Sequence, residues 1–263
     1  MNILVCVKQV PDTAIAIKLD AEQKSIDRSE LTYVVNPFDE YAIEAGLQLK
    51  EKYGGEVTLV TMGPDRADEA LRTGMAMGAD KGVHISDPAL EGSDTLVTAK
   101  VLATAIRGLP YDIVLCGKVA TDDNSGQVGP ALAELLGIPH ISGATTLEVD
   151  DAAKKATATR EIEGGFMRME VPIPAVITAE KDLNAPRYPS LPGIMKAKAK
   201  PVDKKDVASL GMDPSSVGLA GSKIQPMGMS LPPEREAGRI IEGEAEEAAK
   251  ELARLLRAEV KIL

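Results

Sequence analysis

Short apolar runs alternate with helical patterns over the first two-thirds of the chain. The apolar runs are continuous, as expected for strands covered on both faces, and they predict strands at residues 3–7, 32–35, 57–61, 82–85 and 112–116. Between them, apolar residues at helical spacing predict helices at residues 39–52, 66–77, 95–107 and 127–136. Ser93 or Asp94 is expected to cap the third helix, and Gly137 to end the fourth. This alternation predicts an α/β fold with a doubly wound, mostly parallel sheet.

The pattern changes after about residue 145. Runs at 147–149, 157–162 and 166–171 predict an antiparallel ribbon, and 175–178 predicts one more buried strand. A long stretch rich in Pro, Gly, Ser and Lys follows at 183–236, and we expect it to be irregular and to lie on another chain. Residues 242–258 predict a terminal helix. The expected organisation is therefore an α/β domain at 1–182, an exposed loop at 183–200, and an extended C-terminal arm with a terminal helix at 201–263.

The charge of the chain limits its partners. Its 263 residues include 40 Asp and Glu against 30 Lys and Arg, which gives a formal net charge of −10. Phosphates would be repelled over most of such a surface, so we expect no nucleic-acid partner and no binding to anionic membranes. Neither a membrane-length apolar run nor a targeting presequence is visible, which predicts a soluble cytoplasmic protein without membrane insertion. Cys6 and Cys116 lie in apolar runs, as expected for buried thiols in a reducing compartment.

The most informative segment leaves the predicted strand 112–116 and enters the predicted helix 127–136. It consists of Gly117, Lys118, Val119, Ala120, Thr121, Asp122, Asp123, Asn124, Ser125, Gly126, Gln127 and Val128. In open α/β sheets, ligands bind at the carboxyl edge of the strands, and a helix start offers free N–H groups to a phosphate. An ordinary capped loop would use the same residue types, because Asp, Asn and Ser are good caps. The residues alone leave both interpretations open.

A second segment, Asn36-Pro37-Phe38-Asp39, follows the predicted strand 32–35. Pro37 holds Asn36 extended, and Asp39 stands at the start of a helix. Phe38 is unusual because aromatic residues make up only 3% of the chain. The segment could lie beside the 117–128 loop, or it could simply be a helix cap with a hydrophobic staple. Met62-Gly63-Pro64, at the same sheet edge, reads first as a turn.

Signatures of other chemistries are missing. The chain has no Gly-x-Gly-x-x-Gly after its first strand, no Gly-Lys-Ser/Thr, and no Cys/His spacing typical of zinc. Asp122-Asp123 could form an acid–base pair, but a solvated loop explains them as well and no nucleophile accompanies them. We therefore predict a binding protein without catalytic residues or a metal site.

A third segment, residues 184–200, combines Pro186, Pro189 and Pro192 with apolar residues and a lysine run. Leu191, Ile194 and Met195 could form a small docking site, and the lysines could attract an acidic partner. A surface connector with solvated lysines is the competing interpretation.

At these places the sequence resembles the β subunit of electron-transfer flavoprotein, and the likeness runs from end to end. The similar stretches are residues 3–8, Asn36-Pro37-Phe38, 75–80, Gly117-Lys118 with its acidic loop, 160–165 and 186–200. The resemblance implies a sheet of the adenine-nucleotide-binding type and a heterodimer whose α subunit holds most of an FAD. It implies electron transfer from flavin dehydrogenases, such as the acyl-CoA dehydrogenases of fatty acid β-oxidation, to a quinone oxidoreductase.

The resemblance also assigns residues. It implies an AMP site that consists of Cys6, Asn36, Pro37, Phe38, Asp39, Met62 and residues 117–128, with Phe38 near the flavin ring and Leu191 as the anchor for partner docking. Gln127-Val128-Gly129-Pro130 looks more like electron-bifurcating members, in which a second FAD replaces AMP. Asp123 and the Asn36-Pro37-Phe38-Asp39 loop look more like AMP-binding members, and an Asp side chain at position 123 would crowd a dinucleotide. We expect AMP, and keep as alternatives a second FAD and, from another class, an adenine-nucleotide hydrolase or ATP-binding stress-type protein.

Overall fold

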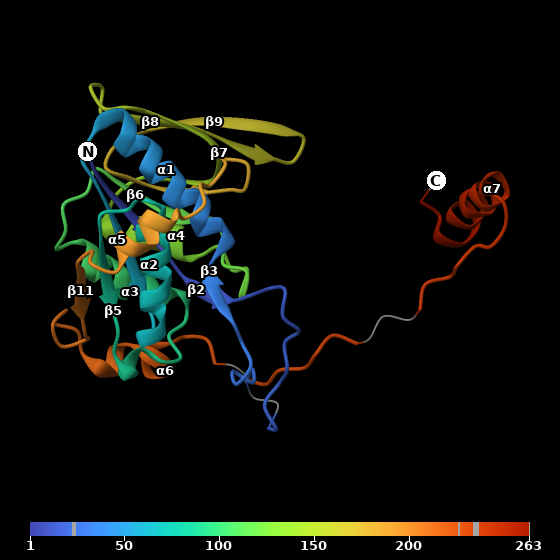
Figure 1. Ribbon diagram of the computed structural model, residues 1–263, viewed down its shortest axis with the longest axis horizontal. Coiled ribbons are helices and arrows are strands. Elements are labelled where there is room, and N and C mark those ends of the chain that lie inside the picture. The colour runs from blue at the N-terminus through green and yellow to red at the C-terminus, as the bar shows by residue number, and fades with distance from the viewer. Residues whose placement is uncertain (23–24, 226, 234–236, 263) are drawn as a thin grey trace.

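The computed structural model describes residues 1–22, 25–225, 227–233 and 237–262 (Figure 1). The strands are β1 (Asn2–Cys6), β2 (Gln9–Pro11), β3 (Tyr33–Val35), β4 (Glu56–Met62), β5 (Lys81–Ile85), β6 (Ile113–Gly117), β7 (His140–Asp150), β8 (Lys155–Ile162), β9 (Gly165–Pro172), β10 (Ala175–Ala179) and β11 (Val202–Lys205). The α-helices are α1 (Pro37–Tyr53), α2 (Asp68–Met77), α3 (Thr95–Ile106), α4 (Val128–Leu136), α5 (Leu191–Ala197), α6 (Gly218–Gly221) and α7 (Ala245–Leu255). Short 3-10 turns are η1 (Asp65–Ala67), η2 (Pro88–Leu90) and η3 (Pro214–Ser216), and η4 (Leu256–Val260) is a π-helical turn.

One large sheet organises the molecule. Within the described ranges its strand order is β11-β5-β4-β1-β6-β10-β7-β8-β9. The strands from β11 to β7 are parallel, and β7, β8 and β9 form an antiparallel ribbon. β2 and β3 make a separate antiparallel pair. The predicted fold class, a doubly wound and mostly parallel sheet with an antiparallel ribbon, is confirmed.

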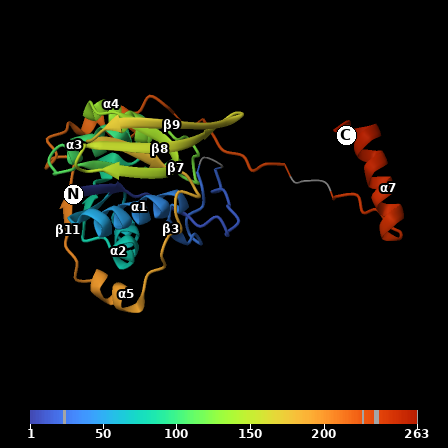
Figure 2. The ribbon, with the colours of Figure 1, turned by 90° about the horizontal axis from the view of Figure 1, so that it is seen from above.

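Both faces of the parallel strands are buried, which explains their continuous apolar runs. Ile3 and Val5 of β1 pack with α1, α2 and Ala197 of α5 on one face. Leu4 and Cys6 pack with α3 and α4 on the other face. Figure 2 shows these two helical layers on opposite sides of the sheet. Successive side chains of a strand point to opposite faces, so a strand with two covered faces must be apolar throughout.

The prediction of an irregular stretch at 183–236 was wrong in its middle part. Residues 191–197 form α5, and β11 extends the sheet by pairing in parallel with β5. Val207 and Val217 are buried in the core on the α3 side. A short edge strand such as Val-Asp-Lys-Lys carries almost no apolar signal, because its hydrogen bonds to β5 are made by the backbone. The extended arm therefore begins only after α6, and residues up to Gly221 belong to the body.

Two further boundaries differ from the prediction. β7 is longer than the expected 147–149 because its first half pairs with β10 and its second half with β8. The terminal helix is confirmed, but α7 begins at Ala245 and continues into a π-helical turn. In both views α7 lies apart from the α/β body at the end of the arm (Figures 1 and 2). Within the described residues, none of the helices has the length and apolar character needed to cross a bilayer.

Candidate functional site

A crevice of about 890 Å³ lies at the carboxyl ends of β4, β1 and β6. These strands are neighbours, and β1 is the point where the chain order reverses, because β4 and β5 follow on one side and β6 on the other. A doubly wound sheet opens a ligand crevice at such a switch point. The volume lies within the range of about 300–1,000 Å³ that is typical of small-molecule and cofactor sites. The starts of α3 and α4 complete its walls.

The structure brings most of the predicted site residues to this crevice. Those that line it are Cys6, Asn36, Asp39, Met62, Gly117, Lys118, Val119, Ala120, Asp123, Ser125, Gly126, Gln127 and Val128. The predicted residues that do not line the crevice belong to the start of α1 and to the 117–127 loop; they are Pro37, Phe38, Thr121, Asp122 and Asn124. The 36–39 segment thus lies beside the 117–128 loop, which is one of the two interpretations that the sequence left open.

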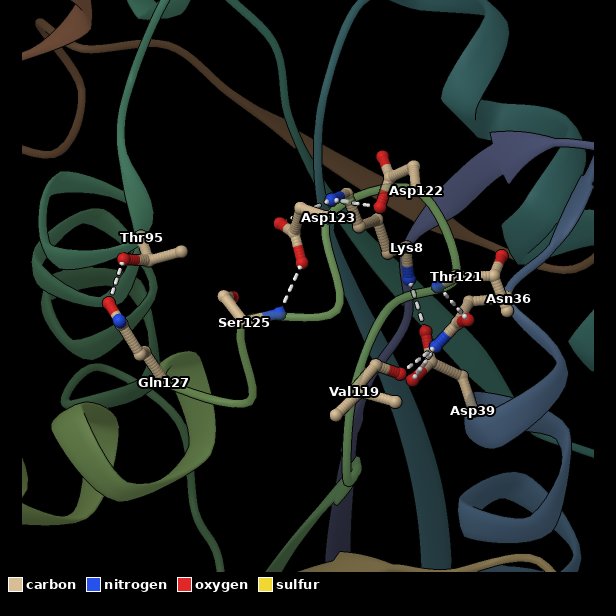
Figure 3. Close-up of polar contacts among 10 residues, drawn as sticks. All are labelled: Lys8, Asn36, Asp39, Thr95, Val119, Thr121, Asp122, Asp123, Ser125 and Gln127. Atoms are coloured by element: carbon tan, nitrogen blue, oxygen red, sulfur yellow. Dashed lines mark hydrogen bonds and ion pairs between the residues drawn. The ribbon is translucent and has the colours of Figure 1, made fainter. Parts of the chain in front are cut away.

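Asn36 and Asp39 connect three separate segments instead of capping α1. Asn36 donates through Nδ2 to the Val119 carbonyl (2.8 Å) and accepts from the Thr121 amide (3.2 Å). Asp39 accepts hydrogen bonds from the backbone amides of Lys8 (2.6 Å) and Gly117 (3.0 Å) and from Asn36 Nδ2 (3.0 Å). Asn36 makes no side-chain cap bond. These two buried side chains hold the 117–121 backbone against the ends of β1 and β3 (Figure 3).

Gly117 is required by this close approach. A Cβ at this position would clash with Asp39 Oδ1 and with the backbone and Cβ of Phe38. Glycine is the residue type that lets two backbone segments come this near to one another. The glycine at this position therefore serves the contact between α1 and β6.

Burial governs the protonation of Asp39. Removal from water raises the pKa of Asp39 from 3.8 to about 7, although its three hydrogen-bond donors act in the opposite direction. Between these two pH values the folded protein retains a proton that the unfolded chain has released. The contribution of Asp39 to the free energy of unfolding is therefore complete below pH 3.8 and is lost as the pH rises through about 7.

We expect the contribution of Asp39 to the free energy of unfolding to fall by about 1.4 kcal/mol for each pH unit between pH 3.8 and about 7. Urea unfolding at several pH values checks it, with Asp39→Asn as the comparison because it cannot titrate. Identical pH profiles for the two proteins would contradict the assignment to Asp39.

Lys8 was not predicted, yet it fixes the acidic part of the loop. Its Nζ lies 2.7 Å from Asp122 Oδ1 and 3.2 Å from Asp123 Oδ2 (Figure 3). Burial lowers the pKa of Lys8, but its hydrogen bonds and charge attraction to Asp122 and Asp123 outweigh burial and raise it. Burial raises the pKa of Asp123, whereas the Ser125 amide and Lys8 hold it below its usual value. The two adjacent carboxylates thus have a cation between them and are held as an ion-pair network, which does not fit an acid–base pair.

The start of α4 presents free donors to the crevice. Among the described residues, the backbone N–H groups of Gly126, Gln127, Val128 and Gly129 have no acceptor. Gly126 has φ +63°, a left-handed conformation that turns the chain into the helix. On the opposite wall, Thr95 Oγ1 donates to Gln127 Oε1 (2.6 Å), which ties the starts of α3 and α4 together (Figure 3). Backbone N–H groups without a hydrogen-bond acceptor at a helix start are suited to bind an anion.

The two cysteines are both free, buried and part of the crevice wall. Cys6 ends β1 and Cys116 lies on the adjacent strand β6, facing the same side of the sheet. The hydrogen bond of the Cys116 thiol to Cys6, together with burial, raises the pKa of Cys116. A thiol that remains protonated is a poor nucleophile, so Cys116 acts as a small apolar residue of the wall.

The 183–200 segment lies away from this crevice and is anchored at both ends. Arg187 makes hydrogen-bonded ion pairs with the buried carboxylate of Glu44 (2.7 Å) and with Glu51 (2.5 Å). Arg72 donates to the carbonyls of Ala197 and Lys200 (both 2.8 Å). Lys200 in turn donates to the carbonyl of Met75 in α2 (3.0 Å) and to that of Ala79 just after α2 (2.6 Å). This clamp was missed because its members lie more than 100 residues apart in the sequence.

Between these anchors the apolar side chains point outward. Leu191, the first residue of α5, is 80% exposed, and Met195 is 69% exposed. The Ser190 side chain caps α5 by accepting from the Gly193 amide. A fixed helix with an apolar outer surface is suited to contact another protein.

Comparison with known proteins agrees with this architecture. A family model described as "Electron transfer flavoprotein domain" matches residues 24–210. The chain is 42% identical to the electron transfer flavoprotein subunit beta of Bacillus subtilis (strain 168), and the match covers 100% of both chains. It is 43% identical to the same subunit of Megasphaera elsdenii, over 93% of this chain and 92% of that one. It is also 39% identical, over 92% of each chain, to the caffeyl-CoA reductase-Etf complex subunit CarD of Acetobacterium woodii. The chain therefore belongs to the electron transfer flavoprotein family, as a relative of its β subunits.

Proposed function

We propose that this chain binds AMP in the crevice and, in a heterodimer with an α subunit, helps to enclose the FAD of an electron carrier. Family membership already gives it an electron-transfer role and an α-subunit partner. We further propose that the carrier accepts electrons from flavin dehydrogenases, such as acyl-CoA dehydrogenases, and delivers them to a quinone oxidoreductase in the cytoplasm.

The observation that carries the nucleotide proposal is the set of unshared amides at residues 126–129, beside a crevice at the switch point of the sheet. A phosphate at the start of α4 would accept from these amides and lie at the positive end of the helix dipole. Lys8 offsets the charge of Asp122 and Asp123, which would otherwise repel the phosphate. Cys6, Met62 and Cys116 give the crevice an apolar floor that is suited to an adenosine.

The flavin of the α subunit would approach from the outer side of the 36–39 segment. Phe38 is half-buried, lies next to Gly117 and is not part of the crevice wall, so its ring is free of the AMP site. Bound FAD supplies the redox chemistry of such a carrier. The role of Phe38 would be to contact the flavin from this side and to limit access of water.

Nucleotide analysis of the purified complex tests the proposal. The chain is expressed together with its α partner, and the nucleotides released by denaturation are quantified. We expect AMP and FAD in equal amounts. A complex that contains neither nucleotide would refute the proposal.

A second candidate is an electron-bifurcating carrier in which FAD occupies the AMP position. The size of the crevice favours it, because the walls reach beyond the α4 start to Arg28 and Glu91. The side chain of Asp123 favours AMP, because it stands in the crevice wall where a dinucleotide would need room. In the bifurcating case the extract would hold twice as much FAD and no AMP, and NADH would reduce the complex.

A further inference from the structure

The C-terminal arm leaves the body along the rim of the crevice. After α6, residues 222–224 pass the start of α3, and Ile224 is one of the residues that line the crevice. Beyond Ile224, none of the described residues before α7 is hydrogen-bonded to the α/β body. Ile224 is therefore the last attached point of an arm that continues away from the body (Figure 1).

One carboxylate holds both the helix and the arm. Asp94 Oδ1 accepts from the Val97 amide (2.8 Å) and so caps α3, for which the sequence left Ser93 and Asp94 as candidates. Asp94 Oδ2 accepts from the amides of Lys223 (2.6 Å) and Ile224 (3.3 Å). The Asp94 amide in turn donates to Ser222 Oγ (2.8 Å). Burial raises the pKa of Asp94, but these amide donors outweigh it and hold the pKa below its usual value, so the carboxylate stays charged at neutral pH.

The segment before Ile224 is fixed more firmly than the arm. The Gly218 amide donates to Ser93 Oγ (3.1 Å), and the Leu219 amide donates to the Glu91 carbonyl (3.0 Å). Both bonds lie upstream of the Asp94 contacts and involve α6 of the body. Loss of the Asp94 contacts would therefore free residues 223–224 without detaching α6, and would remove Ile224 from the crevice wall.

We propose that Asp94 is a positioning residue that makes the C-terminal arm a wall of the crevice and thereby controls release of the bound nucleotide. This inference rests on the proposed nucleotide site. A control of this kind gives a reason for the path of the arm, which passes the crevice before it extends away from the body. A partner that binds the arm would also keep Ile224 at the rim of the crevice. Nucleotide release then depends on whether the arm is attached.

Asp94→Asn separates the two functions of the carboxylate. The amide oxygen of asparagine can still cap α3, but its NH₂ group is a donor and cannot accept from Lys223 and Ile224. In the heterodimer loaded with radiolabelled AMP and chased with unlabelled AMP, we expect this variant to release label about tenfold faster, the factor that corresponds to one lost charged hydrogen bond. Asp213→Asn is the control, because Asp213 is a cap acceptor at η3, outside the crevice, and its release rate should equal that of the wild type.

The double variant tests whether Asp94 acts through Ile224. Ile224→Ala should also speed release, and Asp94→Asn/Ile224→Ala should release no faster than the faster of the two single variants. The inference would be overturned if the effects of the two single variants on the release rate combined in full in the double variant. It would also be overturned if Asp94→Asn released AMP at the wild-type rate. Either result would leave the nucleotide site in place. A wild-type complex that binds no AMP would remove both the site and the inference. Should Asp94→Asn fail to assemble, Ser222→Ala removes one contact of the same junction and is measured in its place.

Discussion

Replacement of Gly126 by Asp should abolish the copurification of AMP and weaken its binding by at least about a hundredfold. Gly126 lines the crevice two residues before the first residue of α4, and its amide is one of four without an acceptor among the described residues. A carboxylate there would occupy the position of the phosphate and repel it. A negative charge at a helix start does not destabilise the helix, so the fold should survive. Calorimetric titration of the nucleotide-free complex with AMP, together with nucleotide content after purification, measures the effect.

Gly126→Ala is the matched control for the backbone. Gly126 has φ +63°, so any side chain there costs about 1–2 kcal/mol of strain in the folded state. Alanine brings this strain without a charge and should therefore retain AMP. Equal loss of AMP in both variants would assign the effect to the backbone, and full AMP content in Gly126→Asp would show that α4 does not bind the phosphate.

The fold was predictable because its strands are buried on both faces. The runs at β1, β4 and β6 are mostly apolar and almost entirely buried, with Thr58 and Thr61 as buried polar residues of β4, and the helices between them bury one apolar side. Local signals also predicted a cap at Ser93 or Asp94, which Asp94 provides, and the end of α4 at Gly137, which is left-handed. The edge strand β11 was missed, because an edge strand is specified by backbone pairing with β5 and hardly by its own side chains.

The site was predictable only where the order of the strands brings its segments to one edge of the sheet. The 36–39 and 117–128 segments both follow strands, so topology alone brings them to one edge of the sheet. Lys8 belongs to the same site, but its partners Asp122 and Asp123 lie more than 110 residues away. Nothing in a single basic residue after a strand indicates which carboxylates it will meet. The same holds for Asp94, whose capping role is local and whose contact with Lys223 is not.

This difference also explains why Asn36 and Asp39 were ambiguous. Their local pattern fits a helix cap, whereas their side chains in fact bond to segments that the sequence places far away. The cost of these bonds is a buried carboxylate with a raised pKa. Such a carboxylate is tolerated where it fixes the geometry of a neighbouring loop, and here that loop is the one expected to hold the phosphate.

Replacement of Leu191 by Ala should lower the rate of electron transfer from a flavin dehydrogenase about tenfold at limiting dehydrogenase concentration. Leu191 is 80% exposed at the first position of α5, and the helix is held to the body by Arg72 and Lys200. Burying a leucine side chain in an interface contributes about 1.5–3 kcal/mol, which corresponds to a factor of ten or more in affinity. The flavin content and the AMP content should not change, because α5 is remote from the crevice.

Leu219→Ala is the control for this variant. Leu219 is an exposed leucine (55%) on α6, a helix separate from α5, so its replacement also shortens an exposed apolar side chain. Steady-state reduction of the carrier, followed over a range of dehydrogenase concentrations, should show a higher KM for Leu191→Ala and a wild-type KM for Leu219→Ala. A docking role requires this contrast, because α5 presents its apolar side chains from a helix that the salt bridges and carbonyl contacts already hold in place. Equal KM values for the two variants would mean that the dehydrogenase does not dock on α5.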